Sequence, residues 1–238
     1  MNPMRAAVII LFCVFLGCAN VYSQNKSILQ LADEYSLALA KYETQIPRRS
    51  AESVLRKGKA VSGQIDEIEA LSETDYALLE KKMRGFTVNR DEILFIEPDL
   101  KFFHALAQKR GTKADLAFFS LMRELKPDNV WAAYYEPQTD VSACTLYGGG
   151  LLTRFYGRAL QFKNDYPKAY VEDIDKEISD ILEQFSDHLC ACGDRASVVK
   201  EFRSFIKTFP KDKKTPEIKR LLKNINKNKD FRFNCQSG

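Results

Sequence analysis

This sequence lacks the short motifs by which common enzyme classes are recognised. It has no G-x-S-x-G nucleophile elbow, no H-E-x-x-H zinc helix, no phosphate-binding loop, no G-x-G-x-x-G and no C-x-x-C. Only two histidines occur in 238 residues, so the side chain most often used as a general base at neutral pH is scarce. The sequence therefore assigns no catalytic residue, no metal ligand and no cofactor, and it favours a protein that is not an enzyme.

Long apolar segments are also lacking, apart from one short run near the N-terminus. The run Ala6–Leu16 is apolar for eleven residues, whereas a transmembrane helix needs roughly 20. Its length is that of the core of a secretory signal peptide, so we expect residues 1–23 to be removed before Gln24. The segment Phe15–Cys18 offers another cleavage site, because its sequence Phe-Leu-Gly-Cys resembles a bacterial lipobox in which Cys18 carries the lipid. We therefore expect an exported protein, either free in the periplasm or anchored to the outer membrane as a lipoprotein.

Neither sign of charge is in strong excess. The chain carries 36 Lys and Arg against 32 Asp and Glu, a net charge of +4. So mild a balance does not indicate binding to nucleic acid or to a strongly anionic partner. The partners that we expect are proteins or peptides of the cell envelope and, through the lipid anchor, the membrane, but no nucleic acid.

Helical periodicity is clearest in the C-terminal half, residues 151–238. Apolar residues recur there at spacings of three and four, which is the pattern of helices with one buried face. One predicted helix begins at Pro167 and runs to Leu189. A second is capped by Asp194 and stopped by Pro210, and a third begins at Thr215. Residues 24–130 form the other predicted helical half.

Two junctions in the C-terminal half resemble each other. The sequence F-K-N-D-Y-P-K at 162–168 and the sequence F-I-K-T-F-P-K at 205–211 lie 43 residues apart. A period of this length, with a helix ending before each proline, is typical of stacked helical hairpins. The sequence thus predicts an all-α fold, either a helical bundle or a short solenoid-like stack of helical hairpins.

The first half carries several helix-start signals and one ambiguous segment. Ser27, Ser72 and Thr112 are placed to cap helices, and Gly58 lies on an apolar seam where a glycine permits close approach. The segment Ile93–Ile96 has the composition of a buried strand. Because no second strand is evident, we interpret it as the approach to a helix that Pro98 begins.

Residues 131–150 form an aromatic and glycine-rich join between the two halves. Four rings are candidates to line a groove for a ligand: Trp131, Tyr134, Tyr135 and Tyr147. The three glycines at 148–150 permit a turn beside these rings. The alternative is that the rings cover the seam between the two halves, which is the commoner use of aromatic side chains.

The cysteines favour disulfides over a metal site. Removal of the leader leaves four of them, Cys144, Cys190, Cys192 and Cys235. A bond between Cys190 and Cys192 closes too small a ring, so we expect two disulfides that join Cys144 and Cys235 to this pair, in either order. A metal site of His188 with Cys190 and Cys192 is the less favoured alternative, because residues 190 and 192 point to different sides of a helix.

The function that these features favour is that of an exported helical binding or scaffold protein, acting through protein or peptide contacts. A stack of helical hairpins buries its apolar faces internally and offers a long surface to a partner. Two other functions stay open, a periplasmic inhibitor or immunity-type protein and an exported enzyme without a recognisable motif.

Overall fold

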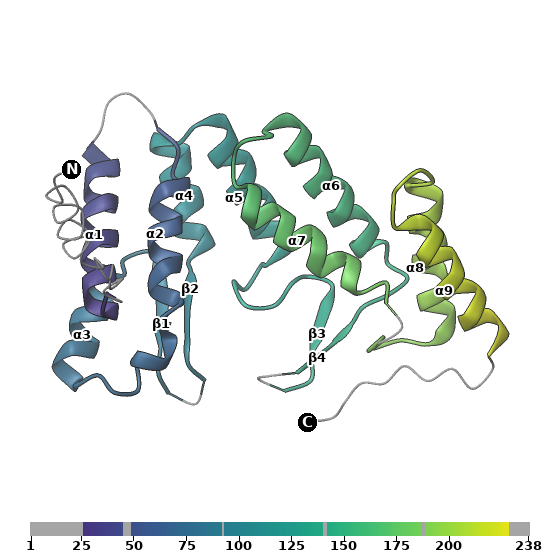
Figure 1. Cartoon of the computed structure of the whole chain (residues 1–238), viewed down its shortest axis with the longest axis horizontal. Helices are drawn as coiled ribbons and strands as arrows, with labels where there is room; N and C mark the ends of the chain where they lie inside the picture. Colours follow the sequence, from purple (N-terminus) through teal and green to yellow (C-terminus); the bar gives the residue numbers. More distant parts are fainter. Residues whose placement is uncertain (1–25, 45–48, 92, 140–141, 187–188, 229–238) are drawn as a thin grey trace, which may run out of the picture.

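The computed structural model describes residues 26–44, 49–91, 93–139, 142–186 and 189–228, and the predicted, mostly helical fold is confirmed (Figure 1). The first half of these residues forms α1 (Ile28–Thr44), α2 (Glu52–Ser62), the 3-10 helix η1 (Ile65–Glu67), α3 (Glu73–Lys82), β1 (Phe86–Asn89), β2 (Phe95–Pro98), α4 (Leu100–Arg110) and α5 (Lys113–Leu125). The second half forms β3 (Tyr135–Pro137), β4 (Ala143–Thr145), α6 (Leu151–Asp165), α7 (Val171–Glu183), α8 (Arg195–Thr208) and α9 (Thr215–Lys227).

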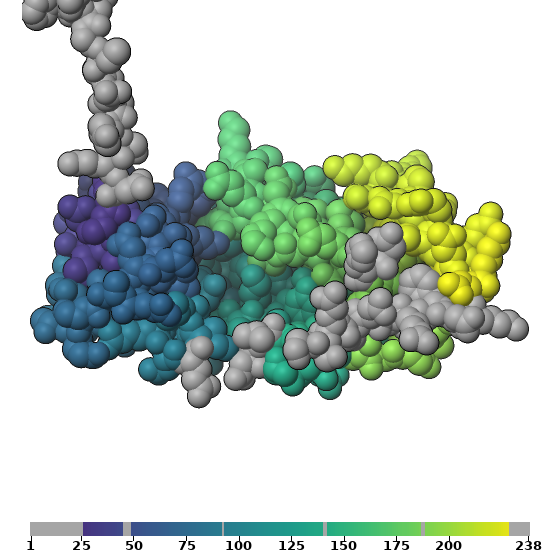
Figure 2. Space-filling model, turned by 60° about the horizontal axis from the view of Figure 1, so that its bottom comes forward, coloured from purple at the N-terminus to yellow at the C-terminus, as the bar shows by residue number. Residues whose placement is uncertain are grey.

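The helices pack in consecutive pairs that lie in a row (Figure 1). The pairs are α1 with α2, α4 with α5, α6 with α7, and α8 with α9, while α3 packs on α1. The strand β2, which leads into α4, packs on α2, while α5 packs on α6 and α6 packs on α8. The first and last pairs therefore lie at opposite ends of an elongated body (Figure 2).

The capping residues read from the sequence begin the expected helices. The Ser72 hydroxyl accepts a hydrogen bond from the backbone of Asp75, and Thr112 and Asp115 form a reciprocal capping box. The Asp194 carboxylate likewise accepts a bond of 2.8 Å from the backbone N–H of Ser197. These contacts join residues three apart in the chain, which is why local sequence predicts them.

Three helices end in the same way, immediately before a proline. The last residues of α5, α6 and α8 are followed by Lys126, Tyr166 and Phe209, whose φ angles are −125°, −135° and −122°. Each of these three residues donates its backbone N–H to the carbonyl four positions earlier. Because the residue before a proline is forced out of the helical region, the repeated junction terminates each helix at one defined turn.

The interpretation of Ile93–Ile96 as the approach to a helix was wrong. Strand β2 pairs in an antiparallel manner with β1, with Phe86 opposite Pro98 and Asn89 opposite Phe95. The following helix, α4, begins at Leu100, capped by the Asp99 carboxylate. The partner strand directly precedes this segment, and the join forms a second hairpin from β3 and β4. The predicted all-α character is confirmed, and the described residues add two small hairpins to it.

The predicted start of a helix at Pro167 was also wrong, because α7 begins at Val171. The residue before it, Tyr170, has a φ of +51°, in the left-handed region that costs energy for a residue with a side chain. Its buried ring stacks on Phe118 with ring centroids 3.8 Å apart. Its hydroxyl donates to Asp115 at 2.6 Å. These two contacts hold the left-handed residue that sets the start of α7.

A buried carboxylate, that of Asp115, fixes three helix starts at once. Besides the hydroxyl of Tyr170, it accepts hydrogen bonds from the Ser50 hydroxyl at 2.8 Å and the Ala51 backbone at 3.0 Å, at the start of α2. It also accepts from the backbone and hydroxyl of Thr112, at the start of its own helix. Five donors in all, three from distant parts of the chain and two from Thr112, point at this one carboxylate. The starts of α2, α5 and α7 are thereby held together.

Candidate functional site

The four aromatic residues of the join do not form one exposed groove wall. Tyr134 and Tyr147 are buried, with 1% and 8% of their surface exposed, whereas Trp131 and Tyr135 are half-buried. The ring of Tyr135 lies 4.6 Å from that of Tyr134 and 6.1 Å from that of Trp131. A ligand at this place would therefore contact chiefly Trp131 and Tyr135.

The polar groups of the join are bonded to Gln184, which follows the end of α7. The Gln184 amide donates to the Tyr135 hydroxyl at 2.8 Å and accepts from the Thr145 hydroxyl at 2.8 Å. The Tyr147 hydroxyl donates to the Gln184 carbonyl at 2.6 Å. Burial raises the pKa of Tyr135 and of Tyr147 above that of an ordinary phenol. These bonds attach the β3–β4 hairpin to α7, and the groove at the join stays a prediction.

The glycine run of the join binds a carboxylate of the chain itself. The fully buried Glu201 of α8 accepts hydrogen bonds from the backbone of Gly148 at 3.1 Å and of Gly150 at 2.7 Å. It also accepts from the backbone and the hydroxyl of Thr153 at 3.1 and 2.9 Å. Gly148 and Gly150 have φ angles of +85° and +74°, which glycine adopts without strain. The Glu201 carboxylate therefore caps the start of α6 by accepting from the backbone N–H groups that begin this helix.

One disulfide is formed among the residues that the structure describes, where two were predicted for the whole chain. Cys144 of β4 is bonded to Cys192, with Cα atoms 5.0 Å apart. The backbones around the bond are paired as well, since Thr145 donates to the Cys190 carbonyl at 2.8 Å and Cys192 donates to the Thr145 carbonyl at 3.0 Å. Of the two predicted orders, only Cys190 with Cys235 is compatible with this bond. Cys235 lies outside the described residues, so the second disulfide stays a prediction.

Two of the cysteines lie close to a carboxylate, in a group of three residues of types that bind metals elsewhere. Ligand atoms of Glu136, Cys144 and Cys192 lie within 4.8 Å of one another. Metal binding needs thiolates, and both sulfur atoms are already joined in the disulfide. His188, the imidazole considered for a metal site, and Cys18, the predicted lipidation site, lie outside the described residues.

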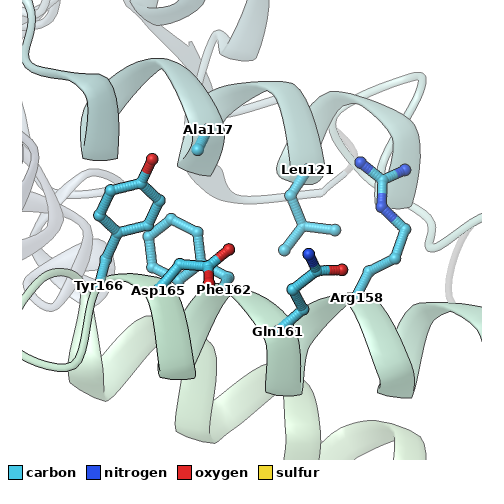
Figure 3. Close-up of a pocket in the computed structure, with 7 residues that line it drawn as sticks. All are labelled: Ala117, Leu121, Arg158, Gln161, Phe162, Asp165 and Tyr166. Carbon is cyan, nitrogen blue, oxygen red and sulfur yellow. The ribbon is translucent and has the colours of Figure 1, made fainter.

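A pocket between α5 and α6 is the site that sequence reasoning missed (Figure 3). It has a volume of about 210 Å³. Ala117 and Leu121 line it from α5, and the other lining residues are Arg158, Gln161, Phe162, Asp165 and Tyr166. Residue 158, the pair 161 and 162, and the pair 165 and 166 lie on successive helical turns, so they share one face of α6 and its end. That spacing is the signal available in the sequence, but it does not reveal that α5 lies opposite.

The polar side chains of the pocket differ in how they are satisfied. Arg158 forms an ion pair with Glu124 of α5 at one end of the pocket. Within the part of the chain that the structure describes, the side chains of Gln161, Asp165 and Tyr166 form no hydrogen bond or ion pair. Figure 3 shows the amide of Gln161 and the carboxylate of Asp165 between the two helices, with Tyr166 at the other end. The pocket thus combines buried apolar walls, from Leu121 and Phe162, with polar groups that are available to a ligand.

Two further cavities lie between α1 and α2 and are less suited to binding. The larger, of about 370 Å³, is lined by Glu34, Arg56 and Lys57 among others. Glu34 is already paired with Lys26 and Lys57, and Arg56 is paired with Glu52. The smaller, of about 180 Å³, adjoins residues 45–48, which lie outside the described residues. We therefore take the α5–α6 pocket as the candidate site.

Charged side chains cross the boundary between the two halves. Lys59 of α2 pairs with Asp173 of α7, and Lys126 pairs with Glu177 of α7 at 2.7 Å. Near these groups, the pKa of Glu97 in β2 is raised, because the surrounding protein removes water from its carboxyl group. The positive charges of Lys126 and Lys59 oppose this shift. The boundary is thus bridged by ion pairs as well as by the bonds of Asp115.

No protein-family model, curated protein or solved structure matches this chain. None of the helices in the described ranges has the length and apolar character to cross a membrane.

Proposed function

We propose that this protein is an exported, solenoid-like helical scaffold that binds a segment of a protein or peptide partner at the α5–α6 pocket. The observation that carries the proposal concerns three polar side chains in the pocket, Gln161, Asp165 and Tyr166. Among the described residues they form no hydrogen bond or ion pair. They lie beside apolar walls in the middle of a row of helix pairs. Rows of this kind present extended surfaces on which a partner segment can lie.

Site-directed photo-crosslinking tests this function. A photoreactive phenylalanine analogue in place of Gln161 should crosslink the intact exported protein to a partner in the cells that produce it. The same analogue in place of Lys223, which is exposed on α9, is the matched control and should not. Equal crosslinking from both positions, or none from either, contradicts a partner site between α5 and α6.

Export and anchoring are a separate part of the proposal. The Cys144–Cys192 disulfide supports it, because such bonds persist in oxidising compartments and are rare in the cytosol. If Cys18 carries a lipid, the protein will occur in the membrane fraction and Cys18→Ser will move it to the soluble fraction. An identical distribution of both proteins between the fractions would contradict the anchor and leave the scaffold function open.

A further inference from the structure

We infer that the α5–α6 pocket selects a basic side chain, Lys or Arg, on the partner segment. This inference rests on the proposed function, since it names the chemistry that the same pocket recognises. It follows from three features of the lining: its uncompensated charge, its aromatic and aliphatic walls, and its size.

The uncompensated charge at the pocket is negative. The guanidinium of Arg158 is paired with Glu124, and Lys163, on the same helix, is paired with Asp175 of α7. Asp165 has no ion pair among the described residues, and its carboxylate lies between the helices (Figure 3). An incoming cation can therefore pair with Asp165 without displacing an existing bond, whereas an incoming anion would have to compete with Glu124 for Arg158.

The walls of the pocket suit the stem of a basic side chain. The rings of Phe162 and Tyr166 lie 5.2 Å apart at an angle of 46°, and Leu121 faces them from α5. Lys and Arg carry apolar stems that pack against such surfaces while their charged ends stay near solvent. A cation close to the face of an aromatic ring gains a further attraction. The same lining would bind a short acidic side chain poorly.

The size of the pocket indicates one side chain of a longer segment. Its volume of about 210 Å³ is below the roughly 300–1,000 Å³ of sites that enclose a small molecule. The pocket is bounded by two helices, and the exposed Gln161 can both donate to and accept from a neighbouring peptide group. The geometry therefore fits a side chain inserted between the helices, with the partner backbone passing over Gln161.

Titration with blocked amino acids tests this selectivity without knowledge of the partner. The probes are N-acetyl-lysine N-methylamide, its arginine equivalent and the uncharged norleucine equivalent. Binding is followed by the amide NMR signals of Gln161 and Tyr166. We expect the two basic probes to bind about two- to fivefold more tightly than the norleucine probe, which is the range that one exposed ion pair supplies.

The variant Asp165→Asn should remove this difference, and Asp66→Asn should preserve it. Asp66 is a matched control because it is exposed and lies in η1, away from the pocket. Equal thermal melting of both variants and the wild type establishes that neither change disturbs the fold. Equal affinity of the wild type for all three probes, or unchanged selectivity in Asp165→Asn, overturns the inference.

The crosslinking experiment separates failure of the inference from failure of the function. Partner capture at position 161 that survives Asp165→Asn would refute a basic side chain and leave the scaffold function standing. Absence of any capture at position 161 would refute the function itself, whatever the probes show.

Discussion

In the first half of the chain a buried carboxylate receives donors from three helix starts, whereas in the second half a buried carboxylate receives donors from one. The donors to Asp115 include Ser50, which is 65 residues away, and Tyr170, which is 55 residues away and belongs to the other half. All the donors to Glu201 lie between residues 148 and 153. The first carboxylate holds the halves together, while the second organises its own half.

The hairpin of the second half is held by a covalent bond, whereas the hairpin of the first half is held by packing. The Cys144–Cys192 disulfide attaches the β3–β4 hairpin to the segment that follows α7. The β1–β2 hairpin is held without such a bond, by packing against α2 and by the Phe86 ring against Tyr35 and Phe103. We therefore expect substitutions of single side chains to destabilise different numbers of helices in the two halves.

The largest expected effect is that of Asp115→Ala. The change leaves the buried Ala51 backbone N–H and the buried Tyr170 hydroxyl without an acceptor, and each unsatisfied donor costs about 1–3 kcal/mol. We expect a loss of about 3–5 kcal/mol in the free energy of unfolding, measured by urea denaturation. Hydrogen exchange should accelerate in α2, α5 and α7 together.

The matched change Glu201→Ala sharpens this contrast. Its stranded donors all lie at the start of α6, so faster hydrogen exchange should be confined to α6 and α8. Faster exchange in α2 upon this change, or exchange confined to α5 in Asp115→Ala, would mean that the two carboxylates do not differ in reach.

Loss of the disulfide should have the next largest effect. The bond joins residues that are 48 apart in the chain. A disulfide that closes a loop of this length stabilises a fold by roughly 2–4 kcal/mol, chiefly by restricting the unfolded chain. The double variant Cys144→Ser with Cys192→Ser should lower the free energy of unfolding by that amount. Cys190→Ser is the control for the predicted Cys190–Cys235 bond, and peptide mapping of the unreduced protein tests whether that second bond exists.

We expect the loss of stability on removal of the disulfide to affect the second half of the chain and not the first. Hydrogen exchange of α1 and α2 should therefore be unchanged in the double variant at low denaturant. If α1 and α2 exchange faster, the disulfide stabilises the whole chain rather than one half.

The parts of the fold that sequence predicted are those that depend on residues close in the chain. Helix caps at Ser72, Thr112 and Asp194 were confirmed because a cap joins residues three apart. The repeated helix ends before Pro127, Pro167 and Pro210 follow from a local steric clash. Helical stripes were visible for the same reason, since a buried face needs only a periodic pattern.

The parts that sequence did not predict depend on distant residues. Strand β2 could not be assigned without recognising β1, and neither four-residue strand carries a strong pattern of its own. The start of α7 depends on the bond from Tyr170 to Asp115, across 55 residues. The pocket requires knowledge of which face of α5 lies opposite α6. Half of its lining pattern was present in the sequence at 158–166, but its opposite wall was not.

A pair of helical glycines offers a finer comparison of the two halves. Gly58 of α2 lies under the Phe86 ring, and a Cβ atom there would be 2.2 Å from the ring, whereas at Gly157 of α6 it would be 3.2 Å from Phe209. Gly58→Ala should lower the free energy of unfolding by about 1–3 kcal/mol through overpacking. Gly157→Ala needs only a small shift of the ring and gains about 1 kcal/mol of helix propensity, so we expect little net change.

Thermal melting of the two glycine variants measures this difference. Equal melting temperatures would show that Phe86 can move as freely as Phe209. A Gly157→Ala protein that melts well below Gly58→Ala would reverse the comparison and place the tighter packing in the second half.

The smallest expected effect distinguishes the two β-hairpins by pH. The Glu97 side chain is exposed at the surface. The protein around its carboxyl group nevertheless removes part of its water, which raises its pKa above the usual value of 4.5. The folded state therefore holds the proton of Glu97 more tightly than the unfolded state does, and this group favours folding less as the pH rises from 4.5 through the raised pKa. Glu97→Gln should remove that decline, so that the variant gains stability relative to the wild type at neutral pH and not below pH 4.5.

Glu136→Gln, at the middle of β3, is the control in the other hairpin. Urea unfolding from pH 4 to 7 compares the three proteins, and parallel profiles of Glu97→Gln and the wild type would show that the β1–β2 hairpin does not desolvate this carboxyl group.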